Sequence, residues 1–346
     1  MKNILVTGAG AVLGQGIIRS LIVNRLDNII IHSADPEVKS TGHFLADKAH
    51  VIPYAKDPEY ISSIIDIINK FSIDLILIGT DTELPIFAKN KKLIEDSSNV
   101  KILVSNINVI NIANDKFLTS KFLQETNHPF PISYMARDKV GVNILRSSTN
   151  FPFFAKPVDG ARSRGLIKIK NDIDLKLVLD NPENLVIQEY LTDEFGEYTS
   201  GCLVFNGKCK AVVTLKRDLR DGNTYRAYYS NEYKKYDDFI ISVAEKLGVE
   251  GPCNFQFRIK DNKPVIFEIN ARFSGTTPIR FMFGFNEVNA CLDYILNNQD
   301  IKMPILKEGV VMRAWSDLFI ENDQFKQLST FNVLDNPKSI FHTFEK

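Results

Sequence analysis

Strand and helix signals alternate over the first hundred residues, and this alternation constrains the fold more than any other feature of the chain. Short apolar runs are separated by segments with helical periodicity. The expected strands are 3–6, 28–32, 75–78 and 101–104, and the expected helices are 14–23 and 60–71. Such an order places successive strands parallel in one doubly wound sheet, with helices on its faces. This prediction covers residues 1–112.

The first strand-to-helix turn is rich in glycine. Four glycines lie between residues 8 and 16, and bare backbone amides at a helix N-terminus can hold an anion. One interpretation is the nucleotide site of a Rossmann-like NAD(P)-dependent oxidoreductase, and Asp35 lies near the place of a ribose-binding acid. The other is a tight turn with close helix packing, which Leu13 favours because a strict GxGxxG pattern needs glycine there.

The second half of the chain predicts antiparallel pairing. Asn206-Gly207 is typical of two-residue hairpins and lies between the expected strands 198–205 and 208–216. A second hairpin, 253–259 with 264–269, should turn at Asp261-Asn262. Residues 113–190 and 191–300 are therefore predicted to be two α+β subdomains built on antiparallel sheets. Residues 301–346 should form a C-terminal extension packed on the core, in which Val310 to Trp315 is strand-like.

Three polar residues alternate along the last strand of the second hairpin. Glu268, Asn270 and Arg272 have the spacing i, i+2, i+4, which places them on one face of a strand. The hairpin brings Gln256 near the first two. Carboxylate and amide oxygens suit a hard metal ion, and an arginine beside them suits phosphate. The alternative is a structural salt bridge between Glu268 and Arg272.

Lys156 ends an apolar strand and precedes a loop of glycine, serine and arginine. Flexible backbone amides together with cationic side chains are typical of a phosphate cradle. The order differs from GxxxxGK[ST], because here the lysine comes before the glycines. A lysine on a strand is otherwise most often a solvated charge.

The charge balance limits the classes of partner. The chain has 346 residues, of which 42 are acidic and 42 are basic, so its net charge is near zero. This balance argues against nucleic acid or an anionic membrane surface as the main partner. No apolar run approaches the length of a membrane span, and the apolar run at the start of the sequence is too short for a signal peptide. A cytoplasmic location is expected.

Ordered motifs from Lys2 to about Asn298 resemble the ATP-grasp superfamily, in the branch similar to the large subunit of carbamoyl-phosphate synthase. The order and spacing of the motifs carry this resemblance. The motifs are the glycine-rich first turn, Asp115-Lys116, Phe154-Ala-Lys-Pro157, Gly160 to Gly165, Gln188-Glu-Tyr-Leu191, Glu197-Tyr198, Asn254-Phe-Gln256 and Glu268-Ile-Asn-Ala-Arg272.

The resemblance implies an ATP-grasp fold and a role for each matched residue. Lys116 and Lys156 would contact the phosphates of ATP, and Arg272 would contact the transferred phosphate or acyl phosphate with help from Arg217. The loop that would close over the phosphates consists of Gly160, Ala161, Arg162, Ser163, Arg164 and Gly165. Gln188, with the backbone of Glu189, Tyr190 and Leu191, would hold adenine, and Glu197 would bind the ribose hydroxyls. The magnesium-ligand positions are Gln256, Glu268 and Asn270.

The implied activity is that of a ligase. It would use ATP and two magnesium ions, with manganese as an alternative metal, to activate a carboxylate as an acyl phosphate and join it to an amine. The partners would be small-molecule substrates, which we expect near residues 10–14 and Thr80 to Glu83; a homodimer is left open. The other hypotheses are the oxidoreductase and an ATP-binding protein without turnover.

Overall fold

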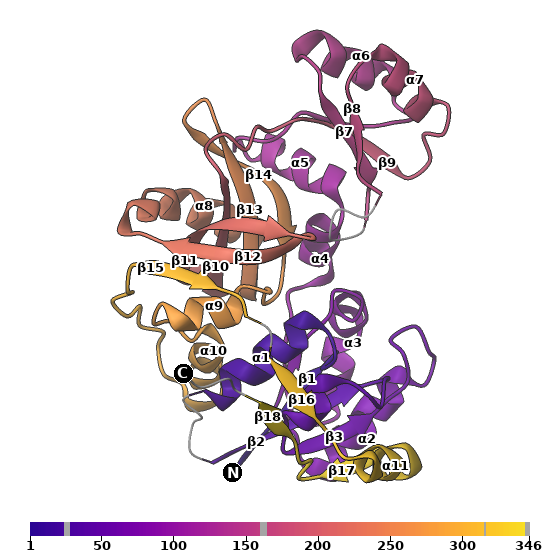
Figure 1. Cartoon of the computed structure of the whole chain (residues 1–346), viewed down its shortest axis with the longest axis vertical. Helices are drawn as coiled ribbons and strands as arrows, with labels where there is room; N and C mark the ends of the chain where they lie inside the picture. Colours follow the sequence, from indigo (N-terminus) through magenta and orange to yellow (C-terminus); the bar gives the residue numbers. More distant parts are fainter. Residues whose placement is uncertain (24–27, 160–164, 315, 343–346) are drawn as a thin grey trace.

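A computed structural model describes residues 1–23, 28–159, 165–314 and 316–342. Three main sheets follow one another along the long axis of the molecule, as Figure 1 shows. The N-terminal sheet lies at one end, a larger antiparallel sheet in the middle and a small antiparallel sheet at the other end. The predicted combination of α/β and α+β architecture is therefore confirmed.

The N-terminal sheet is parallel except at one edge. Its parallel strands have the order β3-β2-β1-β4-β5. They are β1 (Lys2–Thr7), β2 (Ile29–Asp35), β3 (Lys48–Val51), β4 (Leu75–Ile78) and β5 (Lys101–Leu103). The intervening helical elements are α1 (Val12–Ile22), η1 (Thr41–Phe44), α2 (Tyr60–Phe71) and α3 (Leu84–Asp96). Because the strand order reverses beside β1, a crevice is expected at the carboxyl ends of β1 and β4.

Strand β1 is buried on both faces, as expected for a sheet covered by helices. Ile4, Leu5 and Val6 have no exposed surface. Ile4 and Val6 belong to one core cluster, whereas Leu5 belongs to another. This alternation explains why the strand appears in the sequence as an uninterrupted apolar run.

Two helices connect the N-terminal sheet to the rest of the chain. They are α4 (Ile107–Asn114) and α5 (Lys116–Glu125), and both contact β14 of the middle sheet. Asp115 caps α5, because its carboxylate accepts the backbone N–H groups of Phe117 and Leu118 at 2.8 and 2.9 Å. The subdomain boundary proposed at residue 112 falls within α4.

The small sheet has its own core. Its strands have the order β6-β9-β7-β8, and all of its pairs are antiparallel. The strands are β6 (Ser133–Met135), β7 (Phe153–Pro157), β8 (Ile167–Ile169) and β9 (Leu185–Glu189). The helices are α6 (Lys139–Ser148) and α7 (Asp172–Leu179). Apolar residues of both helices and of the sheet form a separate buried cluster.

The middle sheet carries both predicted hairpins. Its order is β14-β13-β10-β11-β12-β15. The strands are β10 (Glu197–Phe205), β11 (Lys208–Arg220), β12 (Asn223–Tyr229), β13 (Gly251–Lys260), β14 (Lys263–Asn270) and β15 (Gly309–Met312). The helical elements are η2 (Asn231–Tyr236), α8 (Asp237–Leu247), α9 (Thr277–Met282) and α10 (Glu287–Asn297). Asn206-Gly207 and Asp261-Asn262 form the turns, and all four residues have positive φ.

The C-terminal extension contributes strands to two different sheets. β15 pairs with β12 of the middle sheet and includes Val310, where a strand was expected, while Trp315 lies outside the described residues. β17 (Val333–Asp335) pairs antiparallel with β3 of the N-terminal sheet. Between these strands lie β16 (Asp317–Phe319) and α11 (Asn322–Phe331), and β16 pairs with β18 (Ile340–His342).

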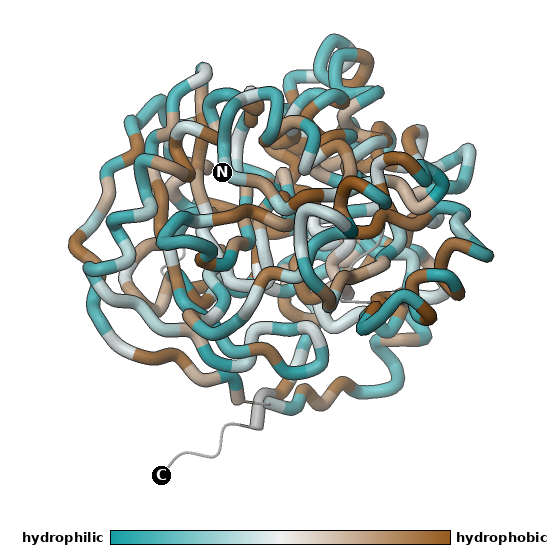
Figure 2. Tube along the Cα trace, turned by 90° about the horizontal axis from the view of Figure 1, so that it is seen from above, coloured by the Kyte–Doolittle hydropathy of each residue, from teal (hydrophilic) through white to brown (hydrophobic). Residues whose placement is uncertain are grey.

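Several elements were not predicted from the sequence patterns. They are β3, α3, α4, β6, α6, β8, α7, β12, α9, α10, β16, α11, β17 and β18, together with the short helical elements η1 and η2. Hydrophobic segments run through the interior of the molecule, and many hydrophilic segments lie at its outer turns (Figure 2). Among the described residues, no helix has the length and apolar character needed to cross a membrane.

Candidate functional site

A cavity of about 300 Å³ lies where the three sheets meet. It is lined by residues of the glycine-rich turn, of the segment after β4, of the small sheet and of the middle sheet. The lining includes ten of the predicted site residues: Lys116, Lys156, Gln188, Glu189, Leu191, Glu197, Arg217, Gln256, Glu268 and Arg272. Gly160, Ala161, Arg162, Ser163 and Arg164 lie outside the described residues. Gly165 is described and has φ of 72°.

The predicted metal-ligand positions lie together because of strand register. Gln256 on β13 is directly opposite Glu268 on β14. One carboxylate oxygen of Glu268, Oε1, accepts hydrogen bonds from the side-chain amides of Gln256 and Asn270, both at 2.9 Å. The paired-strand prediction for these three residues is confirmed.

This group fits a magnesium ion that arrives with a nucleotide. Magnesium takes oxygen ligands and is often held by one or two carboxylates together with substrate phosphates. Glu268 supplies one carboxylate. The amide oxygens of Gln256 and Asn270 accept from Arg217 and Arg272 in this structure, and each could serve as a ligand after the amide leaves its arginine and rotates toward Glu268. Across the described part of the chain, no group of three or more His, Cys, Asp or Glu residues is spaced to hold a metal. The site therefore depends on amides, and phosphate oxygens would complete the coordination.

Arg272 pairs with the N-terminal domain rather than with Glu268. Its Nε and Nη2 atoms donate to the two carboxylate oxygens of Asp81 at 2.7 and 3.1 Å. Nη2 also donates to Oδ1 of Asn270 at 2.8 Å. The alternative of a structural salt bridge between Glu268 and Arg272 is therefore wrong. Because Asp81 follows β4, this bidentate pair connects the parallel sheet to the end of β14, the strand that carries Glu268 and Asn270.

Two lysines, Lys116 and Lys156, line the same cavity as Glu268 and Arg272. Lys156 donates to Oε1 of Gln188 at 2.7 Å, and Nε2 of Gln188 donates to Oγ of Ser133 at 2.7 Å. Gln188, predicted to hold adenine, thus orients Lys156 in this structure. Burial, together with the nearby charges of Lys116 and Arg258, lowers the pKa of Lys156 to about 8, against the opposing effect of Glu268. Burial also lowers the pKa of Lys116. An incoming polyphosphate would relieve this crowding of positive charge.

Glu197 lies between two arginines. Its Oε1 accepts from Nε and Nη2 of Arg217 at 3.0 and 2.6 Å. Its Oε2 accepts from Nε and Nη2 of Arg258 at 3.2 and 2.9 Å. A carboxylate has about four acceptor sites, so ribose binding by Glu197, as predicted, would have to displace at least one of these contacts. Arg217 also donates to Gln256 at 2.6 Å, which links it to the metal-ligand group.

The side chains of Glu189, Tyr190 and Leu191, where the resemblance places adenine, have partners within the protein. The carboxylate of Glu189 accepts the backbone N–H of Ile132 at 3.0 Å and pairs with Lys260. The ring of Tyr190 packs edge-on against Phe154 at a centroid distance of 5.4 Å. Leu191 is buried, and its carbonyl oxygen accepts from Arg258 at 2.7 Å.

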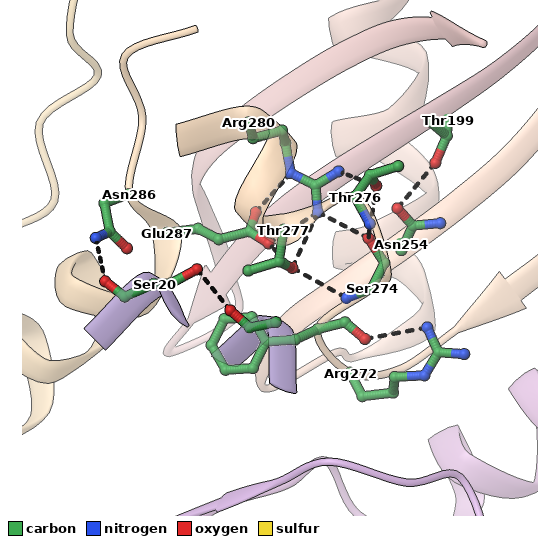
Figure 3. Close-up of polar contacts among 12 residues, drawn as sticks. Ser20, Thr199, Asn254, Arg272, Ser274, Thr276, Thr277, Arg280, Asn286 and Glu287 are labelled. Carbon is green, nitrogen blue, oxygen red and sulfur yellow. Dashed lines mark hydrogen bonds and ion pairs between the residues drawn. The ribbon is translucent and has the colours of Figure 1, made fainter. Parts of the chain in front are cut away.

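A buried ion pair supports the loop that follows Arg272. Arg280 and Glu287 are 1% and 2% exposed, and Nε of Arg280 donates to Oε2 of Glu287 at 2.7 Å. The remaining donors of Arg280 bind Oγ1 of Thr276 at 2.7 Å and Oγ of Ser274 at 3.0 Å. Figure 3 shows this network beside Arg272. Because Ser274 and Thr276 line the cavity, the pair holds one of its walls in place.

The glycine-rich turn is tightly packed. A Cβ added at Gly14 would lie 2.2 Å from the carbonyl oxygen of Gly8, so the close approach of α1 to β1 requires glycine. Asp35 accepts the N–H of Gly10 at 2.8 Å and that of Glu37 at 3.0 Å. The tight-turn interpretation is confirmed. Asp35 is engaged within the protein where a dinucleotide would need it for ribose, which weighs against the oxidoreductase.

A second cavity, of about 530 Å³, lies on the other side of the segment after β4. Its lining includes Gly8, Gly10, Tyr60, Thr80 and Glu83. Glu83 is 4% exposed and accepts from Tyr60 at 2.6 Å and from Thr7 at 2.9 Å. Burial raises the pKa of Glu83 to about 7, against the lowering effect of these hydrogen bonds. Because Gly8 follows β1 and Thr80 follows β4, this cavity is the crevice expected where the strand order reverses.

Two arginines of the main cavity were not predicted. Arg258 lies two residues after Gln256 on β13, so alternation along that strand could have identified it. Arg313 follows β15 and donates to the carbonyl oxygen of Gly275. It reaches the cavity because β15 pairs with β12, and nothing in the local sequence indicates that pairing.

Two family models and several curated proteins match parts of this chain. Residues 181–318 match a family described as ATP-grasp in the biosynthetic pathway with Ter operon, and residues 4–103 match the PylC-like N-terminal domain. The carbamoyl phosphate synthase large chain of Sulfurisphaera tokodaii is 25% identical over 287 residues, which cover 78% of this chain. The alignment covers 26% of that relative, so this chain spans about a quarter of its length.

Solved structures share the fold at low sequence identity. An ADP complex of N5-carboxyaminoimidazole ribonucleotide synthetase has a TM-score of 0.72 and 14% identity, over 89% of this chain and 80% of that one. The biotin carboxylase domain of Hydrogenobacter thermophilus 2-oxoglutarate carboxylase, solved with MgADP, ADP and bicarbonate, has a TM-score of 0.69. Its identity is 16%, over 89% of this chain and 73% of that one.

Proposed function

We propose that this chain is an ATP-dependent carboxylate–amine ligase. Its fold is that of the ATP-grasp superfamily, and its sequence is similar to the carbamoyl-phosphate synthase large-chain branch. One observation carries the proposal: the phosphate-binding candidates Lys116, Lys156 and Arg272 line a single cavity together with Glu268. Cations and an oxygen-ligand group around one space suit the transfer of a phosphoryl group.

The reaction needs activation because a carboxylate is a poor electrophile. In the proposed reaction, a carboxylate oxygen attacks the γ-phosphorus of ATP, the bond to the β-phosphate oxygen breaks, and ADP leaves. The amine then attacks the acyl carbon, and phosphate departs. Magnesium, when bound through Glu268 and the phosphates, would neutralise charge at the transferred group. Lys156 and Arg272 would hold the reactants in line.

The solved relatives support the proposed cofactors. Two of them contain ADP, and one contains its magnesium salt. We propose ATP and magnesium for this chain, with the phosphates near Lys116 and Lys156 and adenine against the backbone of residues 189–191. Because Glu268 is the one carboxylate among the three metal-ligand candidates, we expect the metal to enter as the nucleotide complex.

The experiment that tests the proposal measures ADP release with pairs of the twenty standard L-amino acids as carboxylate and amine. We expect release with at least one pair and little with either partner alone. Glu268→Gln should abolish it, because the substitution removes the negative charge of the metal site and preserves the side-chain volume. A fully active Glu268→Gln variant would remove Glu268 from the site. Glu232→Gln, at an exposed position outside the cavity, is the matched control.

A further inference from the structure

The carboxylates that line the main cavity have different partners. Those among the described residues are Asp81, Asp159, Glu189, Glu197 and Glu268. Glu189 pairs with Lys260, and Glu197 pairs with two arginines. Glu268 accepts from two amides in the metal-ligand group. Asp159 accepts from Asn184 at 3.2 Å, on the side of the small sheet.

Asp81 differs from Glu197, whose two oxygens are held by different arginines, because a single arginine with a proposed role in the reaction holds both of its oxygens. Arg272 holds the two oxygens of Asp81 in a bidentate geometry, which is also the geometry in which arginine binds phosphate. When a phosphoryl group arrives at Arg272, it competes directly with Asp81. The guanidinium can then exchange one anion for the other, and the carboxylate of Asp81 loses its bidentate arginine contact as the acyl phosphate forms.

The position of Asp81 also suits contact with a second substrate. It follows β4 at the carboxyl edge of the parallel sheet, and its side chain is 37% exposed. Its neighbours Thr80 and Thr82 line the second cavity, of about 530 Å³. A molecule bound there would have one end near Asp81, and Asp81 itself faces the cavity that contains Arg272 and Glu268.

We propose that Asp81 binds the amine substrate in its ammonium form and accepts the proton that must leave before attack. This inference rests on the proposed function and adds the residue that selects the amine. The neutral amine then attacks the acyl carbon, and the bond from that carbon to the phosphate oxygen breaks. The nitrogen loses its second proton to the departing phosphate, and Asp81 releases its proton to solvent. Because the phosphoryl group replaces Asp81 at Arg272, the amine binds to Asp81 only after the carboxylate has been activated.

The test compares two nucleophiles in one assay. The pair of amino acids with the highest ADP release is used with the wild type and with Asp81→Asn, in the presence and absence of hydroxylamine. Hydroxylamine is largely uncharged at neutral pH and traps an acyl phosphate as a hydroxamate, so it does not need an anionic partner. We expect the ratio of amide to hydroxamate to fall by about tenfold or more in Asp81→Asn, because a charged hydrogen bond to the ammonium is lost.

Two further variants sharpen the result. Asp81→Glu keeps the charge and should restore part of the ratio. Asp159→Asn removes a carboxylate from the opposite wall of the same cavity and should leave the ratio near that of the wild type. If Asp81 only positions Arg272, Asp81→Asn will lower amide and hydroxamate equally, and this unchanged ratio would overturn the inference. A wild type without carboxylate-dependent ADP release would overturn the proposed function as well.

Discussion

Lys156 shows how its surroundings change the chemistry of one side chain in the cavity. Burial and two neighbouring cations bring its pKa down to about 8, more than two units below the usual value for lysine. A lysine with this pKa is protonated near neutral pH and loses its charge at mildly alkaline pH. Its contribution to phosphate binding should therefore depend on pH within an accessible range.

We expect the affinity for ATP to fall as the pH rises through about 8. The sign follows from the charge state, because protonated Lys156 attracts the phosphates and neutral Lys156 does not. Above its pKa, the decrease should approach about tenfold per pH unit. Calorimetric titration of ATP into the protein at a series of pH values measures the effect.

Arginine substitutions identify the side chain that causes the pH dependence of ATP binding. Lys156→Arg should flatten the profile, since a guanidinium stays charged throughout this range. Lys116→Arg is the matched control and should keep the inflection near pH 8. An unchanged profile in Lys156→Arg would show that another group titrates.

At the scale of elements, local patterns account for some segments, and long-range pairing accounts for the rest. The helix from Tyr60 to Phe71 has the predicted bounds because its apolar residues recur with helical spacing. The hairpin that joins Gln256 to Glu268 followed from its turn and from strand alternation. β3 has four residues and no strong local signal, and it is held by β2 on one side and β17 on the other.

The residues of the candidate site also fall into two groups, those predicted from local spacing and those brought together by long-range pairing. Glu268, Asn270 and Arg272 were predicted from their spacing on one strand, which is a local property. The pairing of Arg272 with Asp81 joins residues that are 191 positions apart, and no spacing rule indicates it. Arg313 likewise depends on the docking of β15.

The docking of α11 and β17 gives a prediction for the C-terminal extension. Leu328 on α11 is fully buried and belongs to a small cluster with Phe44, Ala49 and Leu334. Leu328→Ala should lower the free energy of unfolding of the part that contains this cluster by about 2 to 5 kcal/mol, because it removes buried methyl groups and leaves a cavity. Urea denaturation measures the change.

Phe331 provides a matched control on the same helix, because its side chain is 72% exposed. Phe331→Ala removes a larger apolar group from a solvated position and should change the midpoint little. Equal effects of the two substitutions would mean that α11 is not packed on the N-terminal sheet as described.

At the scale of the whole molecule, the cavity exists because three sheets meet. The parallel sheet supplies Asp81, the small sheet supplies Lys156, and the middle sheet supplies Glu268. The C-terminal extension adds a strand to two of these sheets. In the proposed reaction, a carboxylate, an amine and ATP would meet at a place to which each sheet contributes a different chemical group.

The proposed function requires that ATP activates a carboxylate as an acyl phosphate. The most direct measurement uses a carboxylate labelled with a heavy oxygen isotope and analyses the released phosphate by mass spectrometry. Each phosphate should carry one labelled oxygen, because the carboxylate oxygen that attacks ATP stays with phosphorus when the amine displaces it. Unlabelled phosphate, released together with a normal amount of amide, would show that no acyl phosphate forms.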